Sequence, residues 1–159
     1  MLGRSYESQV CSISRTLEVF GERWTLLIMR NAAFADSVRF VDFQRSLGIA
    51  TNVLSARLDH LVETGVMQLD GSDYRLTERG RDLVPALIAL TEWGDRWAAP
   101  TGEPVLYRHA AGEHPVAMRL VCEVCGVLDG FDDVEALPGP GMPRPQAERL
   151  LARHHVRHS

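Results

Sequence analysis

Apolar residues recur at helical spacing in the run TNVLSARLDHLVET, which starts at Thr51. Leu54, Leu58 and Leu61 stand at positions i, i+4 and i+7, which places all three on one face of an α-helix. Thr51 can cap the start of this helix, and Gly65 follows where a left-handed C-terminal cap is favoured. The opposite face carries short polar side chains, so the helix can press closely against another surface.

A second amphipathic run, FVDFQRSL, starts at Phe40 and also puts Phe43 and Leu47 on its inner side. Only three residues, one of them a glycine, separate the two runs, which is the spacing of a helix-turn-helix. Residues 66–69 and 74–76 then form two apolar-rich runs around the turn sequence DGSD, a pattern typical of a tight hairpin. Helix, turn, helix and hairpin in this order predict a winged helix, a mainly α fold with a small β-hairpin. The alternative is an ordinary α+β core whose polar residues simply meet water.

Further helices are predicted on both sides of this unit. Residues 11–20 form a short amphipathic helix, and residues 22–34 form a strongly apolar one that can serve as a buried scaffold. After the hairpin, Thr77 can cap a long helix over residues 78–97, whose leucines and tryptophan form a wide apolar stripe. Pro85 must kink this helix or mark a new start, because it has no N–H to donate. A stripe this wide predicts an oligomer interface; the alternative is a helix folded onto its own domain.

The sequence pattern changes after Ala98, where proline, glycine and short apolar runs replace the helical periodicity. Residues 118–122 predict a strand that leads into a C-x-x-C-G turn and a short return strand. We therefore expect two domains. Residues 1–99 form the winged helix-turn-helix and its dimerisation helices, and residues 100–159 form a C-terminal extension with the C-x-x-C hairpin and a Pro/Gly-rich, partly flexible tail.

Composition and charge narrow the class of partner. Of the 159 residues 45% are hydrophobic, and no apolar run approaches the roughly 20 residues that span a bilayer. The N-terminus MLGRSYESQVCS lacks the apolar core of a signal peptide, so we expect a cytoplasmic protein with no membrane partner. The formal net charge of −4 argues against a broadly basic nucleic-acid binder. Contact with DNA would therefore require local placement of arginines, and dimerisation would strengthen it.

Cysteine and histidine positions raise the question of metal and thiol chemistry. Cys122 and Cys125 have the spacing of half a zinc knuckle, and His109 and His114 are the nearest further ligands. A structural zinc site and a plain thiol pair in a hairpin both remain open, and no other cofactor is expected.

Cys11 precedes a predicted helix, whose dipole lowers the pKa of a thiol, although a buried, inert thiol fits as well. No P-loop, nucleophile elbow or metalloprotease motif is present in the sequence, so we expect no enzyme; a thiol-dependent enzyme using the C-x-x-C pair is a third class.

Several motifs coincide in one order along the chain. They are CSISRTLEVFGERWTLLIMR, RF-x-x-F, GIATNVLSARLDHLVETGV, YRLTERGRDLVPAL and EWG, and together they cover Cys11 to Trp97 nearly without gaps. In this respect the chain resembles the HxlR-type regulators, winged-helix transcription factors related to the MarR group. In some of those relatives a cysteine at the position of Cys11 senses oxidants or electrophiles.

The resemblance implies that the helix starting at Thr51 enters the major groove of double-stranded DNA, and that the hairpin is a short wing with about four residues at its tip. Candidates for contacts to base edges are Asn52, Ser55, Ala56 and Asp59. Candidates for contacts to phosphates are Thr51, Arg39, Arg45 and Arg75. Arg57 lies on the flank of the leucine face and either reaches a phosphate or pairs with Glu63 or Asp42.

The resemblance also implies a homodimer in which the first and last helices of the domain pack across a two-fold axis. The expected interface residues are Ile13, Leu17, Leu83, Leu87, Leu90, Trp93 and Trp97. The expected function is sequence-specific regulation of transcription, as a repressor at pseudo-palindromic sites, with a small-molecule effector or oxidation of Cys11 as the signal. The alternative is a winged-helix protein-interaction module without DNA binding, which the acidic charge and Asp59 on the outer face favour.

Overall fold

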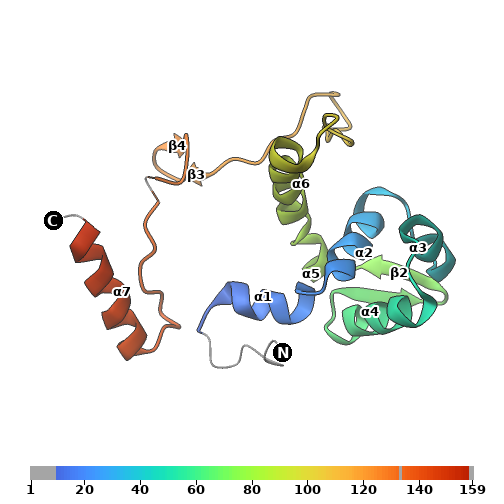
Figure 1. The fold of residues 1–159 in the computed structure, drawn as a ribbon, viewed down its shortest axis with the longest axis horizontal. Helices are drawn as coiled ribbons and strands as arrows, with labels where there is room; N and C mark the ends of the chain where they lie inside the picture. The colour runs from blue at the N-terminus through green and yellow to red at the C-terminus, as the bar shows by residue number, and fades with distance from the viewer. Residues whose placement is uncertain (1–9, 133, 158–159) are drawn as a thin grey trace. The chain divides into compact units, whose positions relative to one another are not determined.

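The computed structural model describes residues 10–132 and 134–157. Its helices and strands follow the order α1 (Ser12–Phe20), α2 (Arg23–Phe34), α3 (Phe40–Leu47), α4 (Thr51–Glu63), β1 (Met67–Asp70), β2 (Asp73–Leu76), α5 (Glu78–Arg81), α6 (Val84–Ala98), β3 (Val121–Cys122), β4 (Gly126–Val127) and α7 (Arg144–Arg157). The expected fold class is confirmed: the chain is mainly helical, carries a wing hairpin after a helix-turn-helix, and has a second short hairpin in its C-terminal part (Figure 1).

The described chain falls into two compact units. Arg15–Met118 form the first unit, which contains the winged helix, and the described residues up to Ser14 belong with those from Arg119 onward to the second. Residues 100–118 therefore group with the winged helix. The expected division into domains at residue 99 stays a prediction.

The core of the winged helix is built around α2. Ile28 and Met29 of α2 are fully buried, as are Phe43 of α3 and the leucine face of α4. Helix α2 contacts α3, α4, α6 and β2, which makes it the scaffold that the apolar run 22–34 predicted. Figure 1 shows α2, α3, α4 and the wing gathered around this core. The polar face of α4 is thus held outward by the burial of its leucines.

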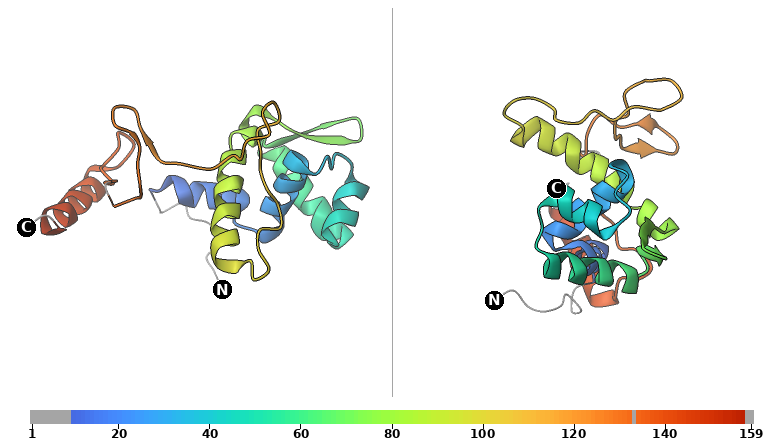
Figure 2. Two further views of the ribbon diagram at one scale, coloured as in Figure 1. Left: turned by 90° about the horizontal axis from the view of Figure 1, so that it is seen from above. Right: turned by 90° about the vertical axis from the view of Figure 1, so that its right-hand side faces the viewer.

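The wing is a tight antiparallel hairpin. Its strands pair from Met67↔Leu76 to Asp70↔Asp73, which leaves only Gly71 and Ser72 at the tip. The expected tip of about four residues was therefore wrong, because the two flanking aspartates pair with each other and extend the strands. Gly71 takes a left-handed φ of 61°, as such a turn requires. The left view of Figure 2 shows this hairpin running along one side of the helices.

A short third strand segment joins the wing to the helix-turn-helix. The Tyr74 N–H donates to the Val38 carbonyl at 2.6 Å, and Arg39 and Asp73 form an antiparallel bridge. This pairing ties the start of α3 to β2. It was not predicted, because residues 38 and 39 alone are too short for a recognisable strand pattern.

The long helix expected over residues 78–97 is interrupted. Helix α5 ends at Arg81, and α6 starts at Val84 with Pro85 in its first turn, where the missing N–H costs nothing. Pro85 therefore marks a new start, one of the two alternatives that the sequence left open. Thr77 caps α5 as expected, since its Oγ1 accepts from the Gly80 N–H at 3.2 Å.

The second unit contains a short hairpin and a terminal helix. Strands β3 and β4 pair through Val121↔Val127 and Cys122↔Gly126, and Gly126 adopts a left-handed φ of 85° after the C-x-x-C turn. The predicted strand over residues 118–122 is thus shorter than expected. Helix α7 follows the Pro/Gly-rich stretch. None of the helices in the described ranges has both the length and the apolar character needed to cross a lipid bilayer.

Candidate nucleic-acid interface

The residue that caps the start of α4 lies one position earlier than the sequence indicated. The N-cap is Ala50, with extended backbone angles, so Thr51 is the first residue inside the helix and not its cap. The Thr51 Oγ1 instead accepts a hydrogen bond of 2.8 Å from the Gln44 Nε2 of α3. This exposed bond links α3 to the start of α4. At the other end Gly65 has a φ of 69°, as the expected left-handed cap requires.

The outward face of α4 is polar and open to solvent. Its exposed residues are those expected to meet base edges, namely Asn52, Ser55, Ala56 and Asp59. The Ser55 Oγ donates to the Asp59 Oδ2 at 3.3 Å, one helical turn away. The small side chains leave the backbone of the first two turns accessible, which allows close approach to a groove.

Two of the arginines expected to contact phosphates meet at Asp73, next to the tip of the wing. Arg75 of β2 and Arg39, the residue before α3, both pair with Asp73, at 2.8 Å and 3.5 Å. Their side chains remain more than half exposed while the Asp73 side chain is largely covered. Asp73 therefore orders two cations from separate elements on one side of the hairpin. Arg45 lies exposed on α3, and its side chain makes no ion pair or hydrogen bond to another described residue.

Arg57 has a different partner from those expected. Its Nε lies 3.6 Å from the Glu22 Oε2, so Arg57 pairs with neither Glu63 nor Asp42. Glu22 is also the N-cap of α2, where the same Oε2 accepts from the Trp24 N–H at 3.0 Å. One carboxylate thus caps the scaffold helix and holds the flank of α4. The Arg57 Nε is buried and has no hydrogen-bond partner among the described residues, so its contact with Glu22 is an ion pair alone.

Replacing Glu22 by alanine should destabilise the domain by about 0.5–2 kcal/mol through loss of the helix cap. Arg57→Ala should cost less, about 0.2–1 kcal/mol, because the pair is partly exposed to solvent. A double-mutant cycle by urea denaturation measures the coupling between the two side chains. Strictly additive losses would show that the 3.6 Å contact contributes nothing.

Sequence reasoning missed three residues that arrange this face: Gln44, Asp73 and Glu22. Asp73 had a usable signal, because residues two apart on a strand share a face and Asp73 stands two before Arg75. Gln44 and Glu22 had none. Their partners are set by the packing of α3 and α2 against α4, which no local pattern reports.

The residues expected at the dimer interface divide into two groups. Ile13, Leu17, Leu90, Trp93 and Trp97 are exposed in the single chain. Leu87 is only 6% exposed and belongs to the core, and Leu83 packs against that core. Leu87 thus packs into the core of its own chain, and the assignment of Leu83 and Leu87 to a dimer interface stays a prediction.

The thiols are free and accessible. Cys11 and Cys125 are exposed and Cys122 is partly exposed. Hydrogen bonds from the Ser14 backbone, the Ser14 side chain and the Ile13 backbone hold the pKa of the Cys11 thiol below its ordinary value. The backbone N–H groups of Cys125 and Val124 do the same for the pKa of Cys122, with a contribution from the Cys125 side chain.

The expected zinc ligands are not brought together as a set. His109 and His114 stand on one hairpin-like turn, with the His109 N–H donating to the His114 carbonyl at 2.8 Å. Cys122 and Cys125 belong to the other compact unit. Among the residues that the structure describes, no group of three or more histidine, cysteine or carboxylate side chains is placed to hold a metal ion.

Known proteins share both the sequence and the fold. A family model of the HxlR-like helix-turn-helix matches residues 19–102. An uncharacterized HTH-type transcriptional regulator of Mycobacterium tuberculosis is 44% identical over 139 residues, which cover 82% of this chain and 87% of the relative. The crystal structure of PA1607, a candidate transcription factor, has a TM-score of 0.71 at 37% identity and covers 82% of this chain and 97% of that chain. For PA1374 of Pseudomonas aeruginosa, also a candidate transcription factor, the TM-score is 0.61 at 32% identity, over 87% of this chain and 99% of that chain. The chain is a member of the HxlR-like helix-turn-helix family of transcriptional regulators.

Proposed function

We propose that the protein is a homodimeric repressor that binds pseudo-palindromic double-stranded DNA through α4 and the wing. The observation that carries this proposal is the division of α4 into two faces. Leu54, Leu58 and Leu61 are fully buried, while the small polar residues on the opposite face are exposed. Because the leucine face of α4 is packed in the core, the helix can present base-reading side chains at fixed positions.

The arginines at the wing supply the charge that the chain as a whole lacks. With a formal net charge of −4, only a local group of cations can attract phosphates. Arg39 and Arg75 lie together on Asp73, and Arg45 is exposed on the neighbouring helix. In this proposal these three side chains contact the DNA backbone, and Asn52 reads an adenine in the major groove.

Asn52→Ala should weaken binding to DNA selected from a random duplex library by about 5- to 150-fold, since one bidentate base contact contributes about 1–3 kcal/mol. Binding to unselected DNA should not change, because that binding depends on phosphates. Affinity is measured by fluorescence anisotropy over a series of salt concentrations. Thr101→Ala, at an exposed residue outside the helices and strands, is the control and should bind like the unmodified protein.

The same titration separates DNA binding from a protein-interaction role. A specific complex loses affinity steeply as salt rises, with a slope that reports the number of phosphates contacted. If no sequence is enriched from the library and binding at low salt shows no preference, the DNA-binding proposal is refuted. The protein-interaction alternative, motivated by Asp59 on the outer face of α4, would then hold.

We also propose that Cys11 is the thiol that oxidants modify in this regulator. Its exposure and the lowered pKa both favour a reactive thiolate. In a Cys122→Ser, Cys125→Ser background, alkylation of Cys11 by iodoacetamide should reach half its maximal rate at a lower pH in the folded chain than in urea. The hydrogen bonds from Ser14 and Ile13 stabilise the thiolate only in the folded state, which sets this sign. Coincident pH profiles would show that the thiol is unactivated.

A further inference from the structure

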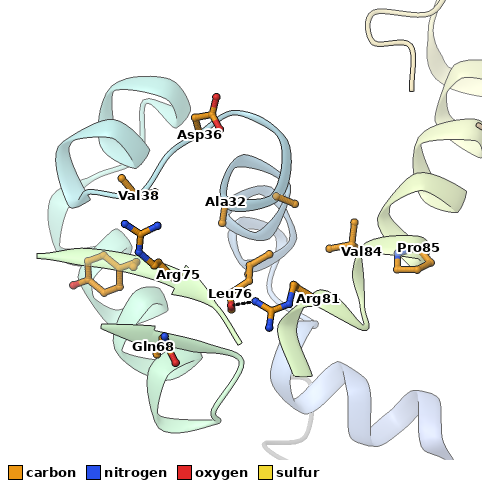
Figure 3. A pocket seen from close by; sticks show the side chains of 11 residues that line it. Ala32, Asp36, Val38, Gln68, Arg75, Leu76, Arg81, Val84 and Pro85 are labelled. Carbon is orange, nitrogen blue, oxygen red and sulfur yellow. Dashed lines mark hydrogen bonds between the residues drawn. The ribbon is translucent and has the colours of Figure 1, made fainter. Parts of the chain in front are cut away.

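A cavity of about 750 Å³ lies within the winged-helix unit, between β2, the end of α2 and the start of α6 (Figure 3). It exists because the third strand segment is short. Residues 38 and 39 cover the edge of β2 only as far as Tyr74, and the chain leaves at Asp36, whose φ is 48°. The edge beyond Tyr74 is therefore open. The volume lies within the roughly 300–1,000 Å³ of sites that bind small molecules.

One wall of the cavity is apolar. Ala33 of α2, Val38 and the first residues of α6, Val84 and Pro85, line it. Figure 3 shows Val84 and Pro85 on one side and the strand β2 on the other. An apolar body of one or two rings would bury its surface on this wall.

The polar groups of the cavity are mainly hydrogen-bond donors. The guanidinium groups of Arg75 and Arg81 line it, and each has N–H groups beyond those used for its one described partner. Arg81 donates its Nη1 to the Leu76 carbonyl at 2.7 Å, which holds it at the strand edge. Asp36 is the one carboxylate among the lining residues, and Figure 3 places it well away from Arg81.

The backbone adds a further donor. Successive N–H groups along a strand alternate in direction, so those of Tyr74 and Leu76 point to the same edge. The Tyr74 N–H is taken by the Val38 carbonyl. The Leu76 N–H therefore points away from β1 as well, it makes no hydrogen bond to a described residue outside the hairpin, and Leu76 lines the cavity. The cavity thus offers more hydrogen-bond donors than acceptors, and one of its walls is apolar. This combination favours a ligand that carries a negative charge.

We propose that this cavity binds a small aromatic carboxylate, whose head group accepts hydrogen bonds from the Leu76 N–H and the Arg81 guanidinium and whose ring lies against Ala33 and Val84. The carboxylate supplies the acceptors that Arg81 and Leu76 lack in the empty cavity. The same chemistry suits other planar organic anions of similar size, but a neutral analogue would leave the donors unpaired.

The ligand would act on DNA binding through the wing, a step that rests on the proposed function. Arg75 lines the cavity and also pairs with Asp73 on the side proposed to meet phosphate. A carboxylate held by the Leu76 N–H and Arg81 would also attract the Arg75 guanidinium, which lines the same cavity, and would compete with DNA for it. Occupancy should therefore lower DNA affinity, by about 5- to 150-fold if the coupling is of ordinary size for allosteric sites.

The site is tested with 2-naphthoate as probe and 2-naphthamide as its neutral analogue, by isothermal titration of the full chain without DNA. Naphthoate should bind at one site per chain and at least about tenfold more tightly than the amide, because hydrogen bonds to a charged group are the stronger ones. Arg81→Gln should remove most of this preference. Arg79→Gln is the matched control, since Arg79 lies on the same short helix but donates to the Thr64 carbonyl and does not line the cavity.

A second variant keeps the test interpretable if Arg81→Gln disturbs the fold. Ala33→Leu adds bulk to the apolar wall from the opposite side and leaves every donor in place, so it should weaken naphthoate and naphthamide alike. Equal affinity for the acid and the amide, absence of saturable binding, or unchanged binding in both variants would each overturn the proposal. Because the titration contains no DNA, its result does not depend on whether the chain binds an operator. An unchanged DNA affinity at saturating naphthoate would refute the coupling to the wing alone.

Discussion

Replacing Gly80 by alanine is expected to lower the free energy of unfolding by about 1–3 kcal/mol, the usual cost of forcing an extra methyl group into packed structure. Gly80 is buried in α5, and a Cβ there would collide with the Val66 carbonyl oxygen and would lie 3.2 Å from the Leu76 Cδ2. The carbonyl cannot withdraw freely. It accepts hydrogen bonds from the Thr77 N–H at 3.1 Å and from the Thr77 Oγ1 at 3.0 Å.

Gly94→Ala provides a control of opposite sign. Gly94 lies inside α6, and a Cβ built there meets no atom within 4 Å. Alanine at this position should stabilise the helix by about 0.5–1 kcal/mol. Urea denaturation at one fixed protein concentration measures both variants, since any dimer makes the midpoint depend on concentration. A Gly80→Ala variant with an unchanged midpoint would show that the base of the wing is loosely packed.

The dimer proposal predicts a sharp contrast between two leucines one turn apart on α6. Leu90→Asp should leave the domain folded, because the side chain is 55% exposed, but should give monomers whose affinity for DNA falls by about 100-fold or more. Leu87→Asp should unfold the domain, because Leu87 is 6% exposed and deleting a buried leucine alone costs about 2–5 kcal/mol. The buried carboxylate adds to that cost.

Light scattering, circular dichroism and DNA titration together distinguish the two outcomes. The proposal requires a dimer for the unmodified chain and a folded monomer for Leu90→Asp. A Leu90→Asp protein that stays dimeric would move the interface away from this part of α6. An unmodified chain that is monomeric at micromolar concentration would contradict the dimer itself.

The elements of the winged helix could be predicted because each carries a local signal. Helices α3 and α4 begin and end close to the expected residues, since a periodic apolar face lies between a loop and a glycine in both cases. Thr77 could be identified as a cap for the same reason. In all these places the structure depends on residues within one or two turns of each other.

The parts that could not be predicted depend on residues far apart in the chain. The pairing of Arg57 with Glu22 requires α4 to pack on the start of α2, and the sequence offered nearer carboxylates that were equally plausible partners. The burial of Leu87 depends on how α6 packs against α2, which no periodic pattern reports. The cavity beside β2 arises from a strand that stops after two residues.

The wing is attached to the domain along β2 and at its base, and not at its tip. Thr77 bonds to the carbonyls of Gly65 and Val66, and Arg79 and Arg81 donate to those of Thr64 and Leu76. The tip at Gly71 and Ser72 takes no part in this anchoring. Residues inserted there would lengthen the hairpin at little cost in stability. A longer tip would therefore extend the reach of the wing without any change in the domain that holds it.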